Sequence, residues 1–118
     1  PTRRSSDLKF MKAGSPLTFI VHNEEISKID FESLPIGILS NVSFSSQKLK
    51  LCEGDWIIMM SDGVTDIGDE WIKELINSKK YDTAEELARM IVKSAVLIRS
   101  KVHDDDITAA VIKISKRI

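Results

Sequence analysis

The stretch 56-WIIMMSDGVTD-66 decides the fold, because an unbroken apolar run ends in it at a carboxylate and a glycine. A run such as 56–60 is typical of a strand that is covered on both faces. Asp62 and Gly63 follow it almost directly. A carboxylate at the end of a buried strand loses hydration unless a partner compensates its charge. The stretch therefore predicts a central strand with a ligand-binding position at its end.

A second acidic group precedes the last apolar segment, 104-DDDITAAVIKI-114. Asp104, Asp105 and Asp106 repel one another, and a hard divalent cation removes that repulsion because Mg²⁺ and Mn²⁺ prefer carboxylate and water oxygens. Gly63 fits such a site, since a residue without Cβ lets the backbone carbonyl approach an ion. Each acidic group taken alone is equally typical of a solvated turn, in which the glycine takes a positive φ.

Apolar and polar residues alternate over much of the first half of the chain, as in half-buried strands. A change of phase near Ser45 and Ser46 predicts a bulge or bend there. A two-residue spacing of Pro35 and Gly37 predicts a constrained loop, in which Gly37 takes a positive φ or allows a close backbone approach. The predicted strands are 8–14, 17–22, 26–30, 42–51, 56–61 and 104–114.

The apolar period changes to a helical one after residue 70, with apolar residues at 71, 72, 75 and 76. Thr83 and Glu86 have the spacing of a capping box, which predicts that a helix begins at Ala84 and continues to Ile98. Several antiparallel strands, two helices and a last strand predict one α+β domain.

The composition excludes several classes of function. The chain has 118 residues and a net charge of −1, so it lacks the basic surface of a nucleic-acid-binding protein and any polybasic membrane patch. Its longest apolar run is far shorter than the roughly 20 residues that cross a bilayer. The single cysteine, Cys52, indicates the reducing cytoplasm. We expect Cys52 to fill the core without a metal-ligating neighbour, and His22 and His103 to lie at the surface.

The first residues, PTRRSSDL, do not continue the pattern that follows them. They resemble the translation of a sequencing-adapter oligonucleotide, so we expect residues 1–8 to be a non-native segment. Residues 9–118 are then expected to be the C-terminal part of a longer domain.

The two acidic motifs together resemble those of PPM-type (2C-type) metal-dependent serine/threonine protein phosphatases. The relevant stretches are GDWIIMMSDGVTD at 54–66 and DDDITAAVIKI at 104–114. FMKAGSPLTFIV at 10–21, followed by SLPIGIL at 33–39, resembles the bacterial group typified by stage II sporulation protein E and its stress-response relatives. The resemblance extends from about residue 8 to residue 114.

This resemblance implies a β-sandwich flanked by helices, of which the chain is an incomplete, C-terminal portion. It implies that Asp62, Gly63 and Asp105 bind Mn²⁺ or Mg²⁺ and that Asp106 supports them, whereas Asp104 has no strict counterpart. The implied reaction is hydrolysis of phosphoserine or phosphothreonine by a metal-activated water. The implied substrate is a regulatory protein such as an anti-sigma-factor antagonist, in the cytoplasm. The resemblance also allows a membrane anchor in the parent protein, outside this chain.

Two other functions stay open at the level of sequence. The first is a pseudophosphatase, a module that binds a partner without turnover. The second is an unrelated α+β domain that binds Ca²⁺, although the spacing of an EF-hand is absent. The family carries an earlier Gly-Asp motif and an earlier Asp-Gly motif that supply further metal ligands, and neither occurs in these residues.

We expect the 118-residue chain to lack phosphatase activity, because Asp62 and Asp105 alone give too few anchors to ions that demand near-octahedral oxygen shells. The measurement is a Mn²⁺-dependent phosphatase assay on this chain and on a chain extended upstream. Equal turnover by both would contradict the ligand assignment.

Overall fold

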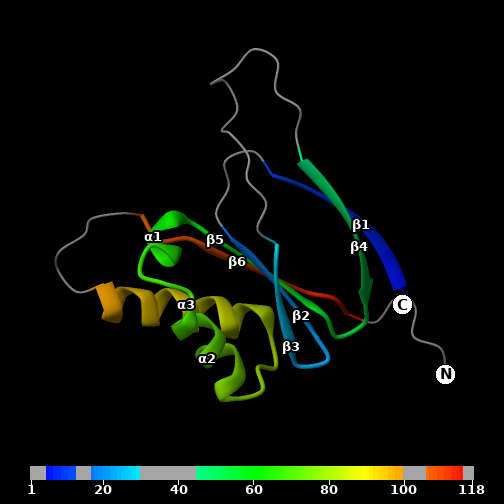
Figure 1. Cartoon of the computed structure of the whole chain (residues 1–118). Coiled ribbons are helices and arrows are strands. Elements are labelled where there is room, and N and C mark those ends of the chain that lie inside the picture. Colours follow the sequence, from blue (N-terminus) through cyan, green and yellow to red (C-terminus); the bar gives the residue numbers. More distant parts are fainter. Residues whose placement is uncertain (1–4, 13–16, 30–44, 100–105, 116–118) are drawn as a thin grey trace, which may run out of the picture.

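The structure is a computed structural model that describes residues 5–12, 17–29, 45–99 and 106–115 (Figure 1). The elements in chain order are β1 (Ser5–Lys12), β2 (Thr18–His22), β3 (Glu25–Ile29), β4 (Ser45–Cys52), β5 (Trp56–Met60), α1 (Asp62–Thr65), α2 (Glu70–Ser78), α3 (Ala84–Arg99) and β6 (Ala109–Lys113). None of the described helices has the length and hydropathy of a membrane-spanning segment.

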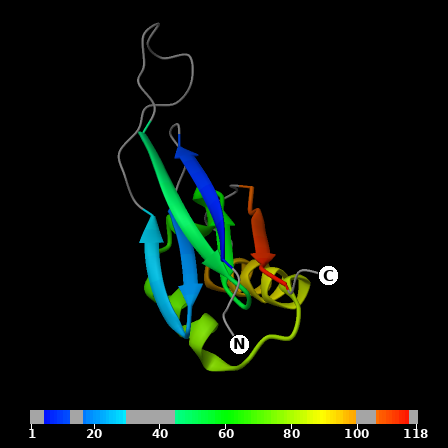
Figure 2. The ribbon, with the colours of Figure 1, turned by 90° about the vertical axis from the view of Figure 1, so that its right-hand side faces the viewer.

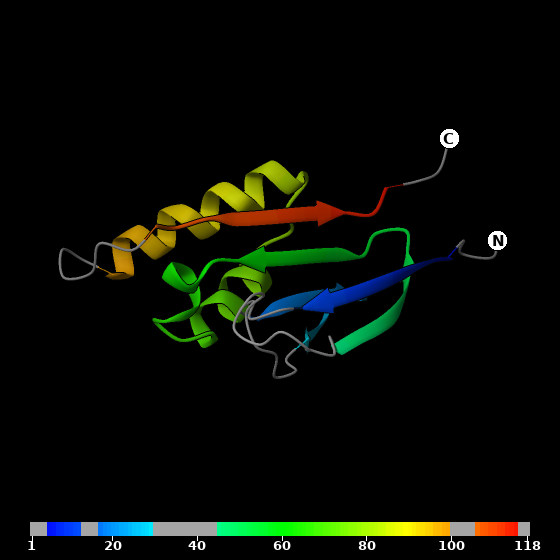
Figure 3. The same ribbon diagram turned by 90° about the horizontal axis from the view of Figure 1, so that it is seen from above.

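The strands form two antiparallel sheets. The larger sheet has the order β3-β2-β5-β6, and the smaller one pairs β1 with β4. Helices α2 and α3 cover one side of the larger sheet, and β1 and β4 lie on the other side (Figures 1 and 2). Seen from above, β6 runs along α3, and β5 lies next to it (Figure 3). The predicted α+β class, with sheets layered against helices, is confirmed.

Strand β5 is the centre of the larger sheet. Ile58 pairs with Phe19 on β2 and with Val111 on β6. Ile57 and Ile58 are 3% and 0% exposed, although successive side chains of a strand point to opposite faces. Both faces of β5 are therefore covered, as its unbroken apolar run predicted.

The helices bury their apolar stripes against the Ile58 face of the sheet. Ile72 of α2 and Leu87 and Ile91 of α3 are almost completely buried in the same cluster as Phe19 and Ile58. Stripes of this kind supply most of the stability of helices in globular proteins. The helices therefore cover one face of the sheet and do not occupy the ends of its strands.

The predicted start of α3 is confirmed by its hydrogen bonds. The Glu86 N–H donates to the Thr83 hydroxyl at 3.1 Å, as a capping threonine requires. The Glu86 carboxylate does not complete the reciprocal bond of a capping box. It accepts from the Asp82 N–H at 3.3 Å and pairs with Lys79 instead.

The expected start of the last strand is wrong, and the described part of β4 contains no bulge. β1 and β4 pair residue by residue from Ser45 to Cys52. The last strand begins at Ala109, because the Thr108 N–H bonds to the Ser61 side chain rather than to a strand. The residues after β5 form the one-turn helix α1.

Two further expectations concern residues 1–8 and Gly37. Strand β1 begins at Ser5, and its residues 5–8 pair with β4. The assignment of residues 1–8 as non-native stays a prediction. Gly37 lies outside the described residues, so its conformation also stays a prediction.

The contact of Lys28 with Asp69 links β3 to the start of α2 and predicts a dependence of stability on pH. The hydrogen bond from Lys28 lowers the pKa of the Asp69 carboxyl below its ordinary value of 3.8, and the same bond raises the pKa of Lys28. A carboxyl with a lowered folded-state pKa stabilises the fold above its unfolded pKa, and this contribution is lost as the pH falls through the folded value.

We therefore expect Lys28→Met to reduce the loss of unfolding free energy on acidification below pH 3.8. Urea unfolding at neutral and acid pH measures the difference. Lys93→Met is the control, since Lys93 is exposed on α3 and makes no ion pair among the described contacts. An equal acid sensitivity of wild type and Lys28→Met would contradict the expectation.

Candidate functional site

The C-terminal end of β5 and the beginning of β6 meet at one end of the larger sheet. β5 and β6 are antiparallel, and Met60 pairs with Ala109. Asp62 follows the end of β5, and the acidic group precedes the beginning of β6. Antiparallel pairing thus brings the two motifs to the same end of the sheet, although they are far apart in sequence.

Ser61 joins the two motifs with three hydrogen bonds. Its N–H donates to the Thr108 carbonyl at 2.9 Å, and the Thr108 N–H donates to the Ser61 hydroxyl at 2.9 Å. The same hydroxyl donates to the Asp106 carbonyl at 3.2 Å. The backbone at 106–108 is therefore fixed beside the residue that precedes Asp62. Sequence reasoning did not identify this role of Ser61.

Asp62 is the first residue of α1, and its side chain is exposed. Its backbone carbonyl accepts from the Asp66 N–H at 2.9 Å, which closes the single turn of α1. No ion pair of the Asp62 carboxylate occurs among the described residues. The carboxylate is thus held at the end of a rigid strand and stays accessible.

Gly63 is buried within α1. Among the described glycines, a positive φ occurs at Gly54 and Gly68, so the alternative of a turn with a positive φ at Gly63 is excluded. The proposed role of its carbonyl stays a prediction.

Asp104 and Asp105 lie outside the described residues, as does His103. The prediction that Asp62 and Asp105 approach each other stays a prediction. Asp106 is described and exposed, and its carbonyl is the one that Ser61 contacts. An accessible carboxylate at Asp62, next to this hydrogen-bonded segment, is a hard oxygen donor of the kind that Mn²⁺ and Mg²⁺ bind. The residues present therefore fit the metal that the sequence motifs imply.

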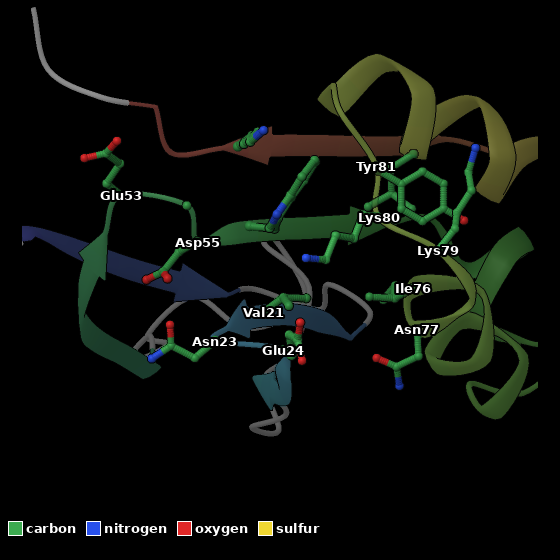
Figure 4. Close-up of a pocket in the computed structure, with 14 residues that line it drawn as sticks. Val21, Asn23, Glu24, Glu53, Asp55, Ile76, Asn77, Lys79, Lys80 and Tyr81 are labelled. Carbon is green, nitrogen blue, oxygen red and sulfur yellow. The ribbon is translucent and has the colours of Figure 1, made fainter.

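A pocket lies at the opposite end of β5. It has a volume of about 580 Å³ and lies between the β2–β3 turn, the β4–β5 turn and the connection of α2 to α3. Figure 4 shows Glu53, Asp55 and Asn23 on one side of it and Lys79 and Tyr81 on the other.

Two of the lysines that line this pocket, Lys79 and Lys113, have partners. The Lys79 ammonium pairs with Glu86 and lies 5.1 Å from the centre of the Tyr81 ring. Lys113 donates to the Asp82 carbonyl at 3.1 Å and lies 5.1 Å from the centre of the Trp56 ring. These contacts hold the wall of the pocket together.

One group of side chains at this end was missed by sequence reasoning. His22, Cys52 and Asp55 come together, with one possible ligand atom of each within 4.8 Å of the others. The expectation that Cys52 lacks a metal-ligating neighbour is therefore wrong. Cys52 and Asp55 lie in the same turn between β4 and β5, whereas His22 ends β2 and comes near them because β2 pairs with β5.

The comparisons with known proteins agree on one family. The family model described as "Stage II sporulation protein E (SpoIIE)" matches residues 2–115. Stage II sporulation protein E of Bacillus subtilis (strain 168) is 30% identical over 117 residues, which cover 94% of this chain and 14% of that protein.

Solved structures of the phosphatase domain of the cell fate determinant SpoIIE from Bacillus subtilis share the fold. One, which contains the PP2C phosphatase domain and a fragment of the regulatory domain, has a TM-score of 0.81 and 29% identity, over 95% of this chain and 35% of that one. Another, presoaked with Mn, has a TM-score of 0.74 and 27% identity, over 99% of this chain and 58% of that one. The chain thus spans little more than half of that domain and a small part of the full-length relative.

We expect Ser61→Ala to lower the free energy of unfolding by about 1–2 kcal/mol, because it removes two hydrogen bonds that are each worth roughly 0.5–1.5 kcal/mol. Urea unfolding measures the change. Ser27→Ala is the matched control, since Ser27 is exposed on β3, and it should change stability by no more than about 0.5 kcal/mol. Equal effects of the two substitutions would refute the role of Ser61 in joining the motifs.

Proposed function

The chain belongs to the stage II sporulation protein E family, and from this premise we propose that it is part of a metal-dependent protein serine/threonine phosphatase. The observation that carries the proposal is the set of hydrogen bonds from Ser61 to Asp106 and Thr108. They hold the two acidic motifs at the same end of the sheet. The likeness to phosphatase domains over almost the whole chain supports it.

In this proposal Asp62, Gly63 and Asp105 hold Mn²⁺ or Mg²⁺. Asp62 and Asp105 contribute carboxylate oxygens, and Gly63 contributes its backbone carbonyl oxygen or a contact through water. When bound, such ions lower the pKa of a water molecule, orient it and neutralise the charge of a phosphoryl group. Asp106 is a neighbour whose backbone is fixed by Ser61, so its contribution is to position Asp105.

The chain's own residues orient the site in a defined order. The buried strand β5 fixes Ser61, and Ser61 fixes the backbone at 106–108. The single turn of α1 then sets the direction of the Asp62 side chain. Pre-organised ligands of this kind raise the rate of a reaction because they need no rearrangement in the transition state.

The proposed substrate is a phosphoserine or phosphothreonine of a regulatory protein. Within the family resemblance, an anti-sigma-factor antagonist is the specific candidate, and its dephosphorylation would activate a sigma factor. The proposed location of this domain is the cytoplasm, whether or not a longer parent protein is anchored in a membrane.

We expect Asp62→Asn and Asp105→Asn, in the complete protein that contains this chain, to lower Mn²⁺-dependent hydrolysis of a phosphoserine protein by roughly 100- to 1,000-fold. Each change keeps the size of the side chain and removes its charge. Steady-state assays over a range of Mn²⁺ concentrations separate loss of metal affinity from loss of turnover.

Asp82→Asn is the matched control, because Asp82 is exposed in the connection of α2 to α3, far along the chain from both motifs. It should keep full activity. An active Asp62→Asn protein would refute the ligand assignment. A wild-type protein that binds the phosphorylated substrate but does not turn it over would favour a pseudophosphatase instead.

A further inference from the structure

The end of β5 that lies away from Asp62 carries a second group of metal-ligand side chains. His22, Cys52 and Asp55 each offer one ligand atom, and these atoms lie within 4.8 Å of one another. The five residues of β5 separate this group from Asp62 by roughly 17 Å, at about 3.3 Å per residue. The group is therefore independent of the proposed phosphatase site.

Asp55 is the fixed point of this group. It is 2% exposed. One carboxylate oxygen lies 2.7 Å from Nδ1 of His22, and the other accepts from the Cys52 N–H at 2.8 Å. Its own N–H donates to the Cys52 carbonyl at 3.0 Å, and its carbonyl accepts from the Ile114 N–H at 2.8 Å. Both its backbone and its side chain are thus held in place.

The charge of Asp55 is the reason to look for a cation. A buried carboxylate is stabilised by hydrogen-bond donors and by a neighbouring cation. Among the described residues, its ion-pair partner is His22, which is charged only when protonated. A divalent cation would compensate the carboxylate while the imidazole stays neutral, and a neutral imidazole is the form that binds metal.

We propose that His22, Cys52 and Asp55 form a Zn²⁺ site with a solvent molecule as the fourth ligand. Thiolate, imidazole and carboxylate together match Zn²⁺, whereas Mn²⁺ and Mg²⁺ prefer oxygen donors alone. Tetrahedral coordination at usual zinc–ligand distances places the ligand atoms about 3.3–3.7 Å apart. Small side-chain rotations bring the three atoms to this spacing, since the present ones lie within 4.8 Å.

Binding releases one proton and moves another within the His22 ring. The Cys52 thiol gives its proton to solvent and coordinates as the thiolate. The neutral His22 ring would coordinate through Nδ1 and carry its single proton on Nε2. That nitrogen lies 3.2 Å from Nδ2 of Asn23, and a flip of this amide presents its oxygen as the acceptor. The proton between Nδ1 and Asp55 passes to solvent while a solvent proton binds Nε2, so the ring stays neutral and the only net release is the thiol proton.

The site is accessible and joins separate elements. The His22 side chain is 44% exposed, and Cys52 is half-buried, so an ion reaches the group from solvent. Cys52 belongs to the smaller sheet, whereas His22 and Asp55 flank strands of the larger one. A bound ion would therefore connect the two sheets and stabilise the folded chain.

The composition makes the test direct. Cys52 is the only cysteine, and the only other histidine is His103. Titration of the whole chain with Co²⁺, used as a spectroscopic substitute for Zn²⁺, should give a thiolate-to-cobalt charge-transfer band at one ion per chain. Zn²⁺ should abolish the band by displacing Co²⁺ and should raise the thermal unfolding temperature.

Cys52→Ser should eliminate the band, and His22→Gln should weaken Zn²⁺ binding by more than the roughly 10–100-fold typical of losing a ligand-orienting partner. His103→Gln is the control and should keep both the band and the affinity. Circular dichroism checks that each variant is folded. Absence of the band at excess Co²⁺, or unchanged Zn²⁺ affinity in a folded His22→Gln, would overturn the site.

Discussion

The burial of β5 on both faces is the constraint on which the rest of the structure depends. Helices α2 and α3 cover the face that carries Ile58, and Ile57 is buried on the other face. A strand enclosed in this way cannot shift its register by one residue without exchanging every side chain between the two faces. Both of its ends are therefore fixed in space, which makes them suitable positions for groups that must be held accurately.

Much of the fold could be predicted from the sequence because its signals are local. The apolar run of β5, the apolar stripe of α3 and the capping role of Thr83 each depend on residues that are close together in the sequence. The exact limits of elements could not be predicted, because they depend on long-range contacts. β6 begins at Ala109 because the preceding Thr108 N–H bonds to Ser61, which is distant in sequence.

The candidate sites show the same division. Asp62 and the acidic group before β6 are conspicuous because charge follows or precedes an apolar run. The bonds of Ser61 leave no such signal, since serine is common in turns and its partners are backbone groups. The proximity of His22 to Cys52 has no local signal either. It results from the pairing of β2 with β5 and from the short turn that joins Cys52, at the end of β4, to Asp55.

The two ends of β5 differ in the donors that they present, and this difference has consequences for metal selection. In a given set of ligands, Zn²⁺ binds more tightly than Mn²⁺, so affinity alone would favour zinc at both ends. At the exposed Asp62 end the proposed donors are oxygens only, and this ligand type favours Mn²⁺ or Mg²⁺. At Asp55 nitrogen and sulfur are available, and this ligand type favours Zn²⁺. A single rigid strand can thus keep a site of oxygen ligands apart from a site with nitrogen and sulfur ligands. The side chains at its two ends are positioned by different neighbours. Backbone groups at 106–108 position the Asp62 end, and the ends of β2 and β4 position the Asp55 end.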